Sequence, residues 1–361
     1  MGAIVMLSGV LAPAASSPQV PVAGMPAQLP GTPVPLPEAP AAIRWTVPIP
    51  AAPIASPLVT GDLVIVAHLP GILAAFHRDD GRELWRAELN PEQGLATDGT
   101  LVFVSAEEAI HALRAADGTV AWRVPASRLT APLLVKDGWI IGASEGKLTA
   151  RRATNGSIVW TVDAGVQREP GAISGDMLFV PQADGRMIAR DLPNGQMRWE
   201  RQLGGSPGEP LVIGDDIFLG ASDKRFYCLD AGSGDVDWDR RVGTAIRGRA
   251  SSDGERVFFA ALDNMVHAVD RWDGALRWQK GVPFRPLAGP VSAVGSVFVA
   301  GPEKEIRRLL ATNGTNAASV TFPNQITLNP GSAVTEAGIV FAAITGSLEE
   351  SWKLSVIGPI R

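Results

Sequence analysis

Tryptophan recurs along this chain at a nearly constant interval. Seven copies are spaced 40, 37, 38, 39, 39 and 40 residues apart, at Trp45, Trp85, Trp122, Trp160, Trp199, Trp238 and Trp278. A glycine stands four residues before each tryptophan after the first, at Gly81, Gly118, Gly156, Gly195, Gly234 and Gly274. Self-similarity at such a period indicates stacked or radial repeats, because each unit buries its apolar face only against its neighbours.

Each interval has the same order of strand and turn signals. In the unit that ends at Trp160, residues 131–141 read as two strands joined by Asp137-Gly138, residues 147–151 as a third strand and residues 158–160 as a fourth. Asp-Gly and Asn-Gly pairs adopt positive φ at low cost and are typical of hairpin turns. Each unit is therefore predicted to be a four-stranded antiparallel sheet, and such units at this period are propeller blades.

Counting the units predicts an all-β fold, an eight-bladed β-propeller over residues 43–361. The interval after Trp278 ends at Ala318, where the tryptophan is lost, and a further partial unit runs to Ile357 without its last strand. Residues 43–47, around Trp45, can supply that strand. We therefore expect the N-terminal strand to close the ring against the C-terminal strands, which removes exposed sheet edges.

The first 42 residues do not share the repeat. Residues 1–17 contain a short apolar run followed by Ala12-Pro13-Ala14, which resembles the cleavage site of a signal peptide, although no basic residue precedes the run. Residues 18–42 hold eight prolines and read as an extended linker. Export to the periplasm or cell envelope is therefore expected, with membrane association at most peripheral.

Composition excludes several classes of function. The net charge of −5 gives no basic surface for nucleic acid. Cys228 is the only cysteine, so no intramolecular disulfide and no thiolate zinc cluster can form. Because it occupies the repeat position held by alanine in other units (Ala75, Ala112, Ala150, Ala189 and Ala268), we interpret it as a small buried residue.

No catalytic or metal-binding constellation stands out. The four histidines (His68, His77, His111 and His267) lack the paired spacing of metal ligands. The chain has no Gly-x-Ser-x-Gly nucleophile elbow and no glycine-rich phosphate loop leading from a strand into a helix. No catalytic, cofactor-binding or metal-binding residue is predicted, and the repeated tryptophans and glycines are interpreted as structural.

One charged set is a candidate binding site. The residues just before the first strand of each blade should lie near the mouth of the central channel, and they include Glu92, Arg128, Arg168, Glu169, Glu209, Arg247, Arg249 and Arg285. Five arginines against three glutamates could form a funnel for an anionic ligand or for an acidic segment of a partner, since guanidinium groups suit carboxylates. The alternative is a solvated rim of mixed charge.

The frame of small residue, turn, glycine and tryptophan resembles the tryptophan-docking repeat of the quinoprotein family, or PQQ-like repeat propellers. Six copies match, and the copy ending at Ala318 is degenerate. The family includes quinone-dependent dehydrogenases, which carry adjacent cysteines, calcium ligands and long insertions, as well as cofactor-free relatives such as the BamB-type assembly lipoproteins of the outer membrane. The short regular intervals and the single cysteine of this chain are more similar to the second group. No lipidation cysteine follows the apolar run.

Three functions remain open at this point. The first is a non-catalytic envelope propeller, expected to be monomeric, that binds another protein through its blade loops or a sheet edge, as the resemblance implies, with no cofactor. The second is a quinone-dependent oxidoreductase using PQQ. The third is a propeller that binds a small ligand in its central channel. Propellers host unrelated functions, so the fold alone does not decide among them.

Overall fold

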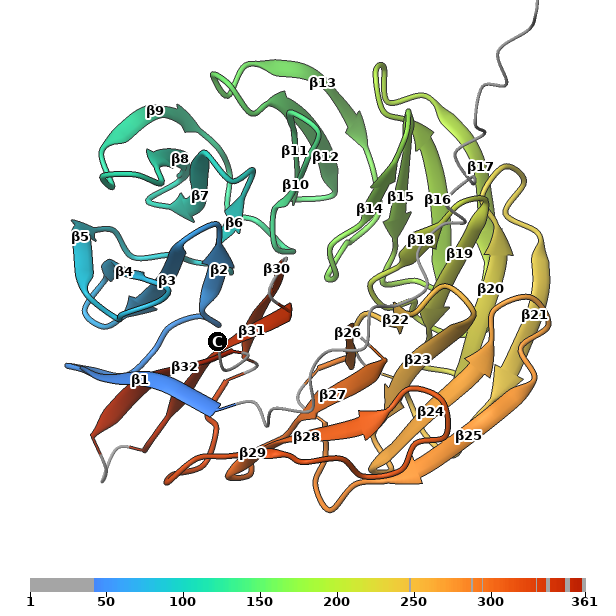
Figure 1. The fold of residues 1–361 in the computed structure, drawn as a ribbon. Coiled ribbons are helices and arrows are strands. Elements are labelled where there is room, and N and C mark those ends of the chain that lie inside the picture. Colours follow the sequence, from blue (N-terminus) through green and yellow to red (C-terminus); the bar gives the residue numbers. More distant parts are fainter. Residues whose placement is uncertain are drawn as a thin grey trace, which may run out of the picture. The chain divides into compact units, whose positions relative to one another are not determined.

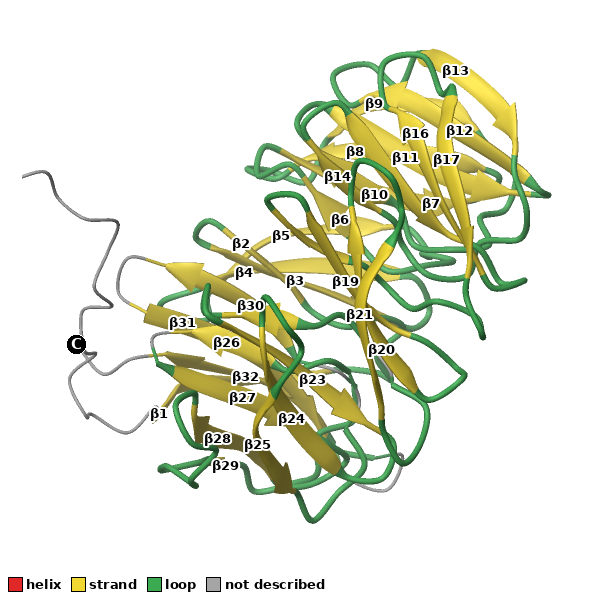
Figure 2. Ribbon diagram, turned by 90° about the vertical axis from the view of Figure 1, so that its right-hand side faces the viewer, coloured by secondary structure: helices red, strands yellow, loops and turns green. Residues whose placement is uncertain are grey.

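The computed structural model describes residues 42–246, 248–286, 288–293, 295–328, 330–335, 338–347 and 351–358. Their strands all belong to the unit Pro35–Arg361 and form eight four-stranded sheets. The described residues contain strands, turns and loops but no helix (Figures 1 and 2). The predicted all-β, eight-bladed propeller is thereby confirmed. The predicted signal-like segment 1–17 and nearly all of the linker 18–42 lie outside the described residues.

The first four blades are formed by consecutive strands. Blade 1 contains β2 (Leu58–Thr60), β3 (Leu63–His68), β4 (Ile72–His77) and β5 (Glu83–Glu88). Blade 2 contains β6 (Ala96–Thr97), β7 (Leu101–Ala106), β8 (Ala109–Arg114) and β9 (Val120–Pro125). Blade 3 contains β10 (Leu134–Lys136), β11 (Trp139–Ser144), β12 (Lys147–Arg152) and β13 (Ile158–Asp163). Blade 4 contains β14 (Ala172–Ser174), β15 (Met177–Pro181), β16 (Arg186–Asp191) and β17 (Met197–Gln202).

The next three blades repeat this order, and the last one does not. Blade 5 contains β18 (Leu211–Ile213), β19 (Asp216–Gly220), β20 (Arg225–Asp230) and β21 (Val236–Arg241). Blade 6 contains β22 (Ser251–Ser252), β23 (Arg256–Ala261), β24 (Met265–Asp270) and β25 (Leu276–Gly281). Blade 7 contains β26 (Val291–Ala293), β27 (Ser296–Ala300), β28 (Glu305–Leu310) and β29 (Val320–Thr321). Blade 8 contains β30 (Gly331–Thr335), β31 (Gly338–Thr345), β32 (Trp352–Gly358) and, from the other end of the chain, β1 (Ala42–Ile49).

Strand β1 completes blade 8, as the sequence predicted. It pairs antiparallel with β32 over its whole length, with Trp45 opposite Val356 and Val47 opposite Leu354. Blade 8 then packs on blade 1 through a cluster that includes Val64, Leu354 and Val356. The two ends of the described chain are therefore held in one sheet, and the ring closes.

The apolar core lies between blades. Eight clusters of buried residues occur in the described chain, one at each interface between neighbouring blades. In Figure 1 the first strand of each blade lies nearest the centre and the fourth lies at the rim. The middle strands are the most buried, and β3, for example, is almost entirely inaccessible. Sheets with two apolar faces are stable only when both neighbours are present, which makes the ring the folding unit.

Each repeated tryptophan joins its blade to the next one. The indole of Trp160 in blade 3 lies against Gly195 in blade 4, where an added Cβ would stand 2.8 Å from ring atoms Cδ2 and Cε3. Its Nε1 donates a hydrogen bond of 2.7 Å to the carbonyl oxygen of Leu192 in that same turn. The same two contacts recur from Trp45 to Gly81, Trp85 to Gly118, Trp122 to Gly156, Trp199 to Gly234, Trp238 to Gly274 and Trp278 to Gly314.

The small residue of the repeat lies directly beside the indole. In blade 3 Ala150 pairs with Trp160 across β12 and β13, and a β-bulge follows at Ala150/Arg151. Cys228 pairs with Trp238 in the same way and is 1% exposed. A larger side chain would collide with the ring on this face of the sheet, so the position accepts alanine or cysteine.

The ring has two distinct faces. We use the name mouth face for the one that carries the loops between blades and the turns between second and third strands. The opposite face carries the turns between first and second strands and the turns between third and fourth strands, including all the glycines that contact tryptophans. The tryptophan contacts are therefore made near the opposite face.

The glycine contact predicts a selective loss of stability in Gly195→Ala. Both Gly195 and Gly175 of blade 4 have positive φ, at +74° and +54°, but nothing lies within 4 Å of a Cβ added at Gly175. The unfavourable φ costs either variant about 1–2 kcal/mol, and the clash with Trp160 adds about 1–3 kcal/mol in Gly195→Ala only. Urea unfolding of both variants measures the difference. Equal losses would mean that the ring contact contributes nothing.

Removal of β1 is expected to destabilise the whole ring. Two truncated chains, beginning at Ala42 and at Pro50, differ only by β1, which supplies the edge strand of blade 8 and Trp45. The shorter chain should show a lower thermal midpoint and bind a hydrophobic dye, since β32 and the blade 1 contact lose their cover. Matching midpoints for the two chains would show that closure by β1 is dispensable.

Candidate functional site

The predicted mouth residues lie on one face of the ring. Each described member stands in a loop between blades on the mouth face, namely Glu92, Arg128, Arg168, Glu169, Glu209, Arg249 and Arg285. Arg247 lies outside the described residues. The arginines of this set are exposed, whereas Glu209 is half-buried. Their role in binding stays a prediction, but the structure divides them between two separate cavities and the open rim.

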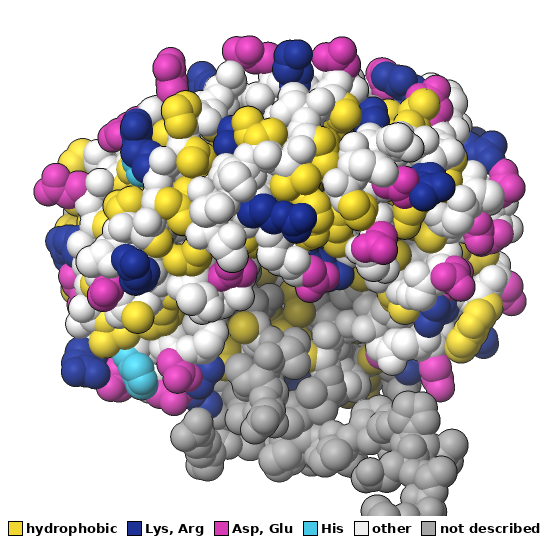
Figure 3. Space-filling view, turned by 90° about the horizontal axis from the view of Figure 1, so that it is seen from above, with side chains coloured by type: hydrophobic (Ala, Val, Ile, Leu, Met, Phe, Trp, Pro, Cys, Tyr) yellow, Lys and Arg dark blue, Asp and Glu magenta, His cyan; other side chains and the backbone are white. Residues whose placement is uncertain are grey.

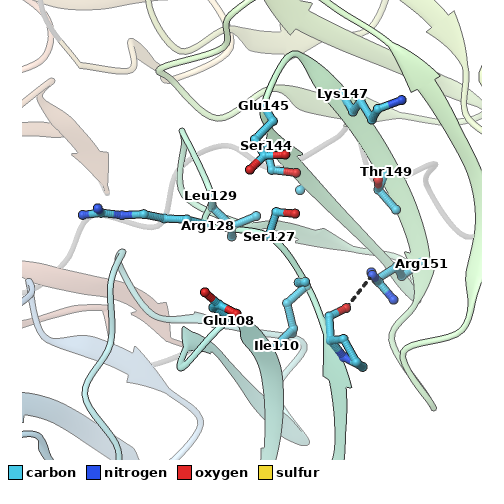
Figure 4. A pocket seen from close by; sticks show the side chains of 13 residues that line it. Glu108, Ile110, Ser127, Arg128, Leu129, Ser144, Glu145, Lys147, Thr149 and Arg151 are labelled. Atoms are coloured by element: carbon cyan, nitrogen blue, oxygen red, sulfur yellow. Dashed lines mark hydrogen bonds between the residues drawn. The ribbon is translucent and has the colours of Figure 1, made fainter.

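The first cavity lies between blades 2 and 3 and has a volume of about 660 Å³. Figure 4 shows Glu108 on one side and Ser144 and Glu145 on the other, with Ser127 and Leu129 between them. Arg128 extends away from the other lining side chains in this view. Its charge is therefore directed away from the cavity in this structure.

The buried charge at the base of this cavity has a structural role. Arg151 is 9% exposed and donates hydrogen bonds to the carbonyl oxygens of Gly156 at 2.9 Å and Pro125 at 3.0 Å. Burial lowers the pKa of this guanidinium. Because Pro125 belongs to blade 2 and Arg151 to blade 3, the side chain joins the two blades. Figure 4 shows the bond to Pro125 as a dashed line.

Arg190 repeats this arrangement one blade later. It donates to the carbonyl oxygens of Gly195 at 2.9 Å and Asp163 at 3.2 Å, and so joins blade 4 to blade 3. The sequence analysis missed both arginines. Their signal is positional, since each directly follows the small residue of its repeat.

The second cavity lies where blades 4, 5 and 6 meet at the mouth face and has a volume of about 580 Å³. Arg168, Glu169 and Glu209 line it. Arg249 stands beside it, with Nε 3.9 Å from Oε1 of Glu209. Burial raises the pKa of the Glu209 carboxyl, and the charge of Glu169 adds to this effect, whereas Arg249 opposes it. This cavity brings together the largest group of predicted mouth residues.

Gln182 is the second-cavity residue that sequence reasoning missed. It directly follows β15, lines the cavity and is 1% exposed. Neither Nε2 nor Oε1 of its side chain has a hydrogen-bond partner within the described part of the chain. A single glutamine after a strand carries no recognisable signal in one sequence, so only the fold could reveal it.

The residues do not fit the quinone site that the resemblance to quinoproteins could imply. The single cysteine, Cys228, lies in β20 beside Trp238 rather than in the channel, and burial raises the pKa of its thiol. Its ligand atom lies within 4.8 Å of those of Asp216 and Asp237. Arg271 already binds Asp216 there, with Nη2 2.8 Å from Oδ2. This cluster is occupied by an arginine of the neighbouring blade and provides no cysteine pair.

Charges on the outside of the ring are mixed. The face drawn in Figure 3 shows lysine and arginine interspersed with aspartate and glutamate, and apolar side chains occur among them. Many aspartates of the opposite face accept hydrogen bonds from the backbone of their own turns, as Asp98 does from Leu101 at 2.7 Å. These aspartates stabilise turns, and no surface of one sign results.

His267 is a buried group that the sequence left unassigned. It is 6% exposed and stacks on Phe259 at 4.9 Å between ring centroids. Neither ring nitrogen has a hydrogen-bond partner among the described residues. Burial lowers its pKa to about 4, with a further contribution from Arg240 and opposition from Asp263. The imidazole is therefore held neutral inside the interface between blades 5 and 6.

This burial predicts a loss of stability in mild acid. Below the ordinary histidine pKa of about 6.5 the unfolded chain binds a proton that the folded chain excludes until about pH 4, so stability falls as the pH falls through this window. The contribution reaches roughly 2 kcal/mol near pH 5. Urea unfolding near pH 7 and near pH 5 should show a smaller pH effect in His267→Phe than in the wild type.

His77→Gln is the matched control, since His77 stands in a turn with its side chain 32% exposed. It should keep the wild-type pH effect. An unchanged pH effect in His267→Phe would show that His267 titrates at its ordinary pKa in the folded chain.

Comparison with known proteins supplies family relationships. A family model described as "Outer membrane protein assembly factor BamB" matches residues 22–96, 69–280 and 222–345. BamB of Yersinia pestis is 29% identical over 123 residues, which are 30% of this chain and 31% of that protein. BamB of Moranella endobia is 33% identical over 123 residues, which are 30% of this chain and 32% of that protein. The matched segment thus spans about a third of the length of these curated relatives.

Solved structures confirm the fold. The crystal structure of BamB from Moraxella catarrhalis aligns with a TM-score of 0.72 at 18% identity, over 88% of this chain and 99% of that one. A quinohemoprotein alcohol dehydrogenase from Pseudomonas putida aligns with a TM-score of 0.71 at 11% identity, over 88% of this chain and 76% of that one. At such identities the similarity concerns the fold alone. No helix in the described residues is long and apolar enough to span a membrane.

Proposed function

Because the chain belongs to the family of the outer membrane protein assembly factor BamB, we propose that it is a non-catalytic scaffold of the cell envelope, binding another protein of outer-membrane assembly. The observation that carries this proposal is the extent of the family match, which runs from residue 22 to residue 345 and includes most of the propeller. A periplasmic location follows from the same proposal.

The mouth face is the proposed binding surface. It carries the loops between blades, both of the larger cavities and the exposed arginines. Loops held by a rigid scaffold are the usual place for recognition, because their sequence can vary without changing the core. A rigid ring also presents these loops at fixed spacings, which lowers the entropic cost of binding.

A ligand-binding propeller is the second candidate. One observation favours it, namely the second cavity with its unpartnered Gln182 amide. No comparable observation favours a quinone-dependent dehydrogenase, whose similarity to this chain lies in the fold.

Amine-directed crosslinking can test the scaffold proposal. Five of the six lysines lie at the mouth-face ends of strands or in mouth-face turns (Lys147, Lys224, Lys280, Lys304 and Lys353), and Lys136 lies at the opposite face. The tagged protein, crosslinked in gently solubilised envelopes and analysed by mass spectrometry, should recover an outer-membrane assembly component. Its crosslinks should involve the five mouth-face lysines.

A second reporter makes the test symmetrical. Asp176→Lys adds an exposed amine to the opposite face in the turn before β15. The partner should not crosslink to Lys136 or to this added lysine. Crosslinks concentrated on these two positions would place the partner on the opposite face, and recovery of no assembly component would contradict the scaffold function.

A further inference from the structure

The second cavity combines features of a built binding site. Its walls come from three blades: the segment 181–183 after β15, the loop segment 206–209 before β18, and Ala245, Ile246 and Gly248 before β22. A volume of about 580 Å³ lies in the range of ligand pockets. Because each wall belongs to a different blade, the cavity exists only in the closed ring.

Gln182 presents an unused amide at this cavity. Its Nε2 donors and Oε1 acceptor are buried and have no hydrogen-bond partner within the described chain. Buried polar groups are otherwise almost always paired, and an unpaired one costs free energy. An amide offers a donor and an acceptor side by side, so another amide, such as a peptide group, matches it with two hydrogen bonds.

The charged groups of the cavity are available for a carboxylate. Arg249 is 50% exposed along its side chain, and its Nε is 3.9 Å from Glu209, which is too long for a hydrogen bond. Arg168 is exposed at the cavity wall. Guanidinium groups bind carboxylates with two parallel hydrogen bonds, and Glu209 holds Arg249 only loosely.

The remaining walls indicate which ligands fit poorly. The described lining residues are otherwise small or aliphatic, with Pro181, Ala183, Ile246 and Leu262 among them, and none is aromatic. Nucleobases and sugars are usually bound by stacking on aromatic rings. A ligand with amide and carboxylate groups on a short flexible chain matches these walls better.

We propose that this cavity binds a carboxylate-bearing peptide segment of the partner, with Gln182 pairing with a backbone amide and Arg168 and Arg249 pairing with the carboxylate. The proposal rests on the scaffold function, since it specifies the chemistry of the segment that the mouth face receives. Glu209 competes with the incoming carboxylate for Arg249, and so sets the affinity.

The test is a titration of the full-length protein with three probes. The first is a short peptide with blocked ends containing Glu and Asp, the second is the same peptide with Gln and Asn, and the third is the free dicarboxylate glutarate. Calorimetry should detect the acidic peptide, with at least tenfold weaker binding of the other two. Affinity for the acidic peptide should fall with added salt, because ion pairs are screened.

Variants identify the residues involved. Gln182→Leu, Arg168→Gln and Arg249→Gln should each weaken acidic-peptide binding by about tenfold, as expected for the loss of one or two charge-assisted or buried hydrogen bonds. Glu209→Gln should strengthen it several-fold, a gain that misfolding cannot produce. Arg114→Gln, at an exposed position of the opposite face, is the control and should bind as the wild type does.

Equal binding of acidic and neutral peptides, or glutarate binding as tightly as the acidic peptide, would overturn the proposal. So would the absence of binding, or an unchanged affinity in Glu209→Gln and Arg249→Gln. If crosslinking recovers an assembly partner while the peptide does not bind, only this inference fails. If the peptide binds as described and no partner is recovered, the scaffold function fails instead.

Discussion

The contact between a tryptophan and a glycine of the next blade holds this propeller together. The indole face needs the space that a Cβ would occupy, and the indole nitrogen reaches the carbonyl of the same turn. Two points of attachment fix both the distance and the rotation between neighbouring blades. A buried aromatic with its polar group satisfied also contributes strongly to stability. Seven interfaces of the described ring have this contact.

The eighth interface, between blades 7 and 8, is held in another way. Ala318 stands where the tryptophan is expected, and β29 is only two residues long. Phe298 of blade 7 and Phe341 of blade 8 pack here with ring centroids 5.1 Å apart, and Phe322 and Ile326 fill the same cluster. Strand β1 compensates on the far side of blade 8, because it completes that sheet and its Trp45 attaches the sheet to blade 1.

The ring was predictable from the sequence because its determinants are local and repeated. The spacing of Trp160 and Gly195 reports one physical contact, and the alanine or Cys228 position reports the neighbour of the ring. The binding site was predictable only in part. Arg168 and Glu209 share a cavity as expected, but Arg128 lies at another one, and Gln182 had no signal. The second cavity is formed by loops of three blades, whose juxtaposition leaves no periodic trace.

Recognition and folding are located on different faces of the ring. From the small residue to the tryptophan the chain is always ten residues long, and this segment forms the glycine turn at the opposite face. The variation in repeat length, from 37 to 40 residues, falls in the segments that pass through the mouth face. Mouth-face loops can therefore change in length and charge without moving a tryptophan from its glycine. The charges around Gln182 stand in loops of this kind, so they can be adapted to a partner at little cost to the fold.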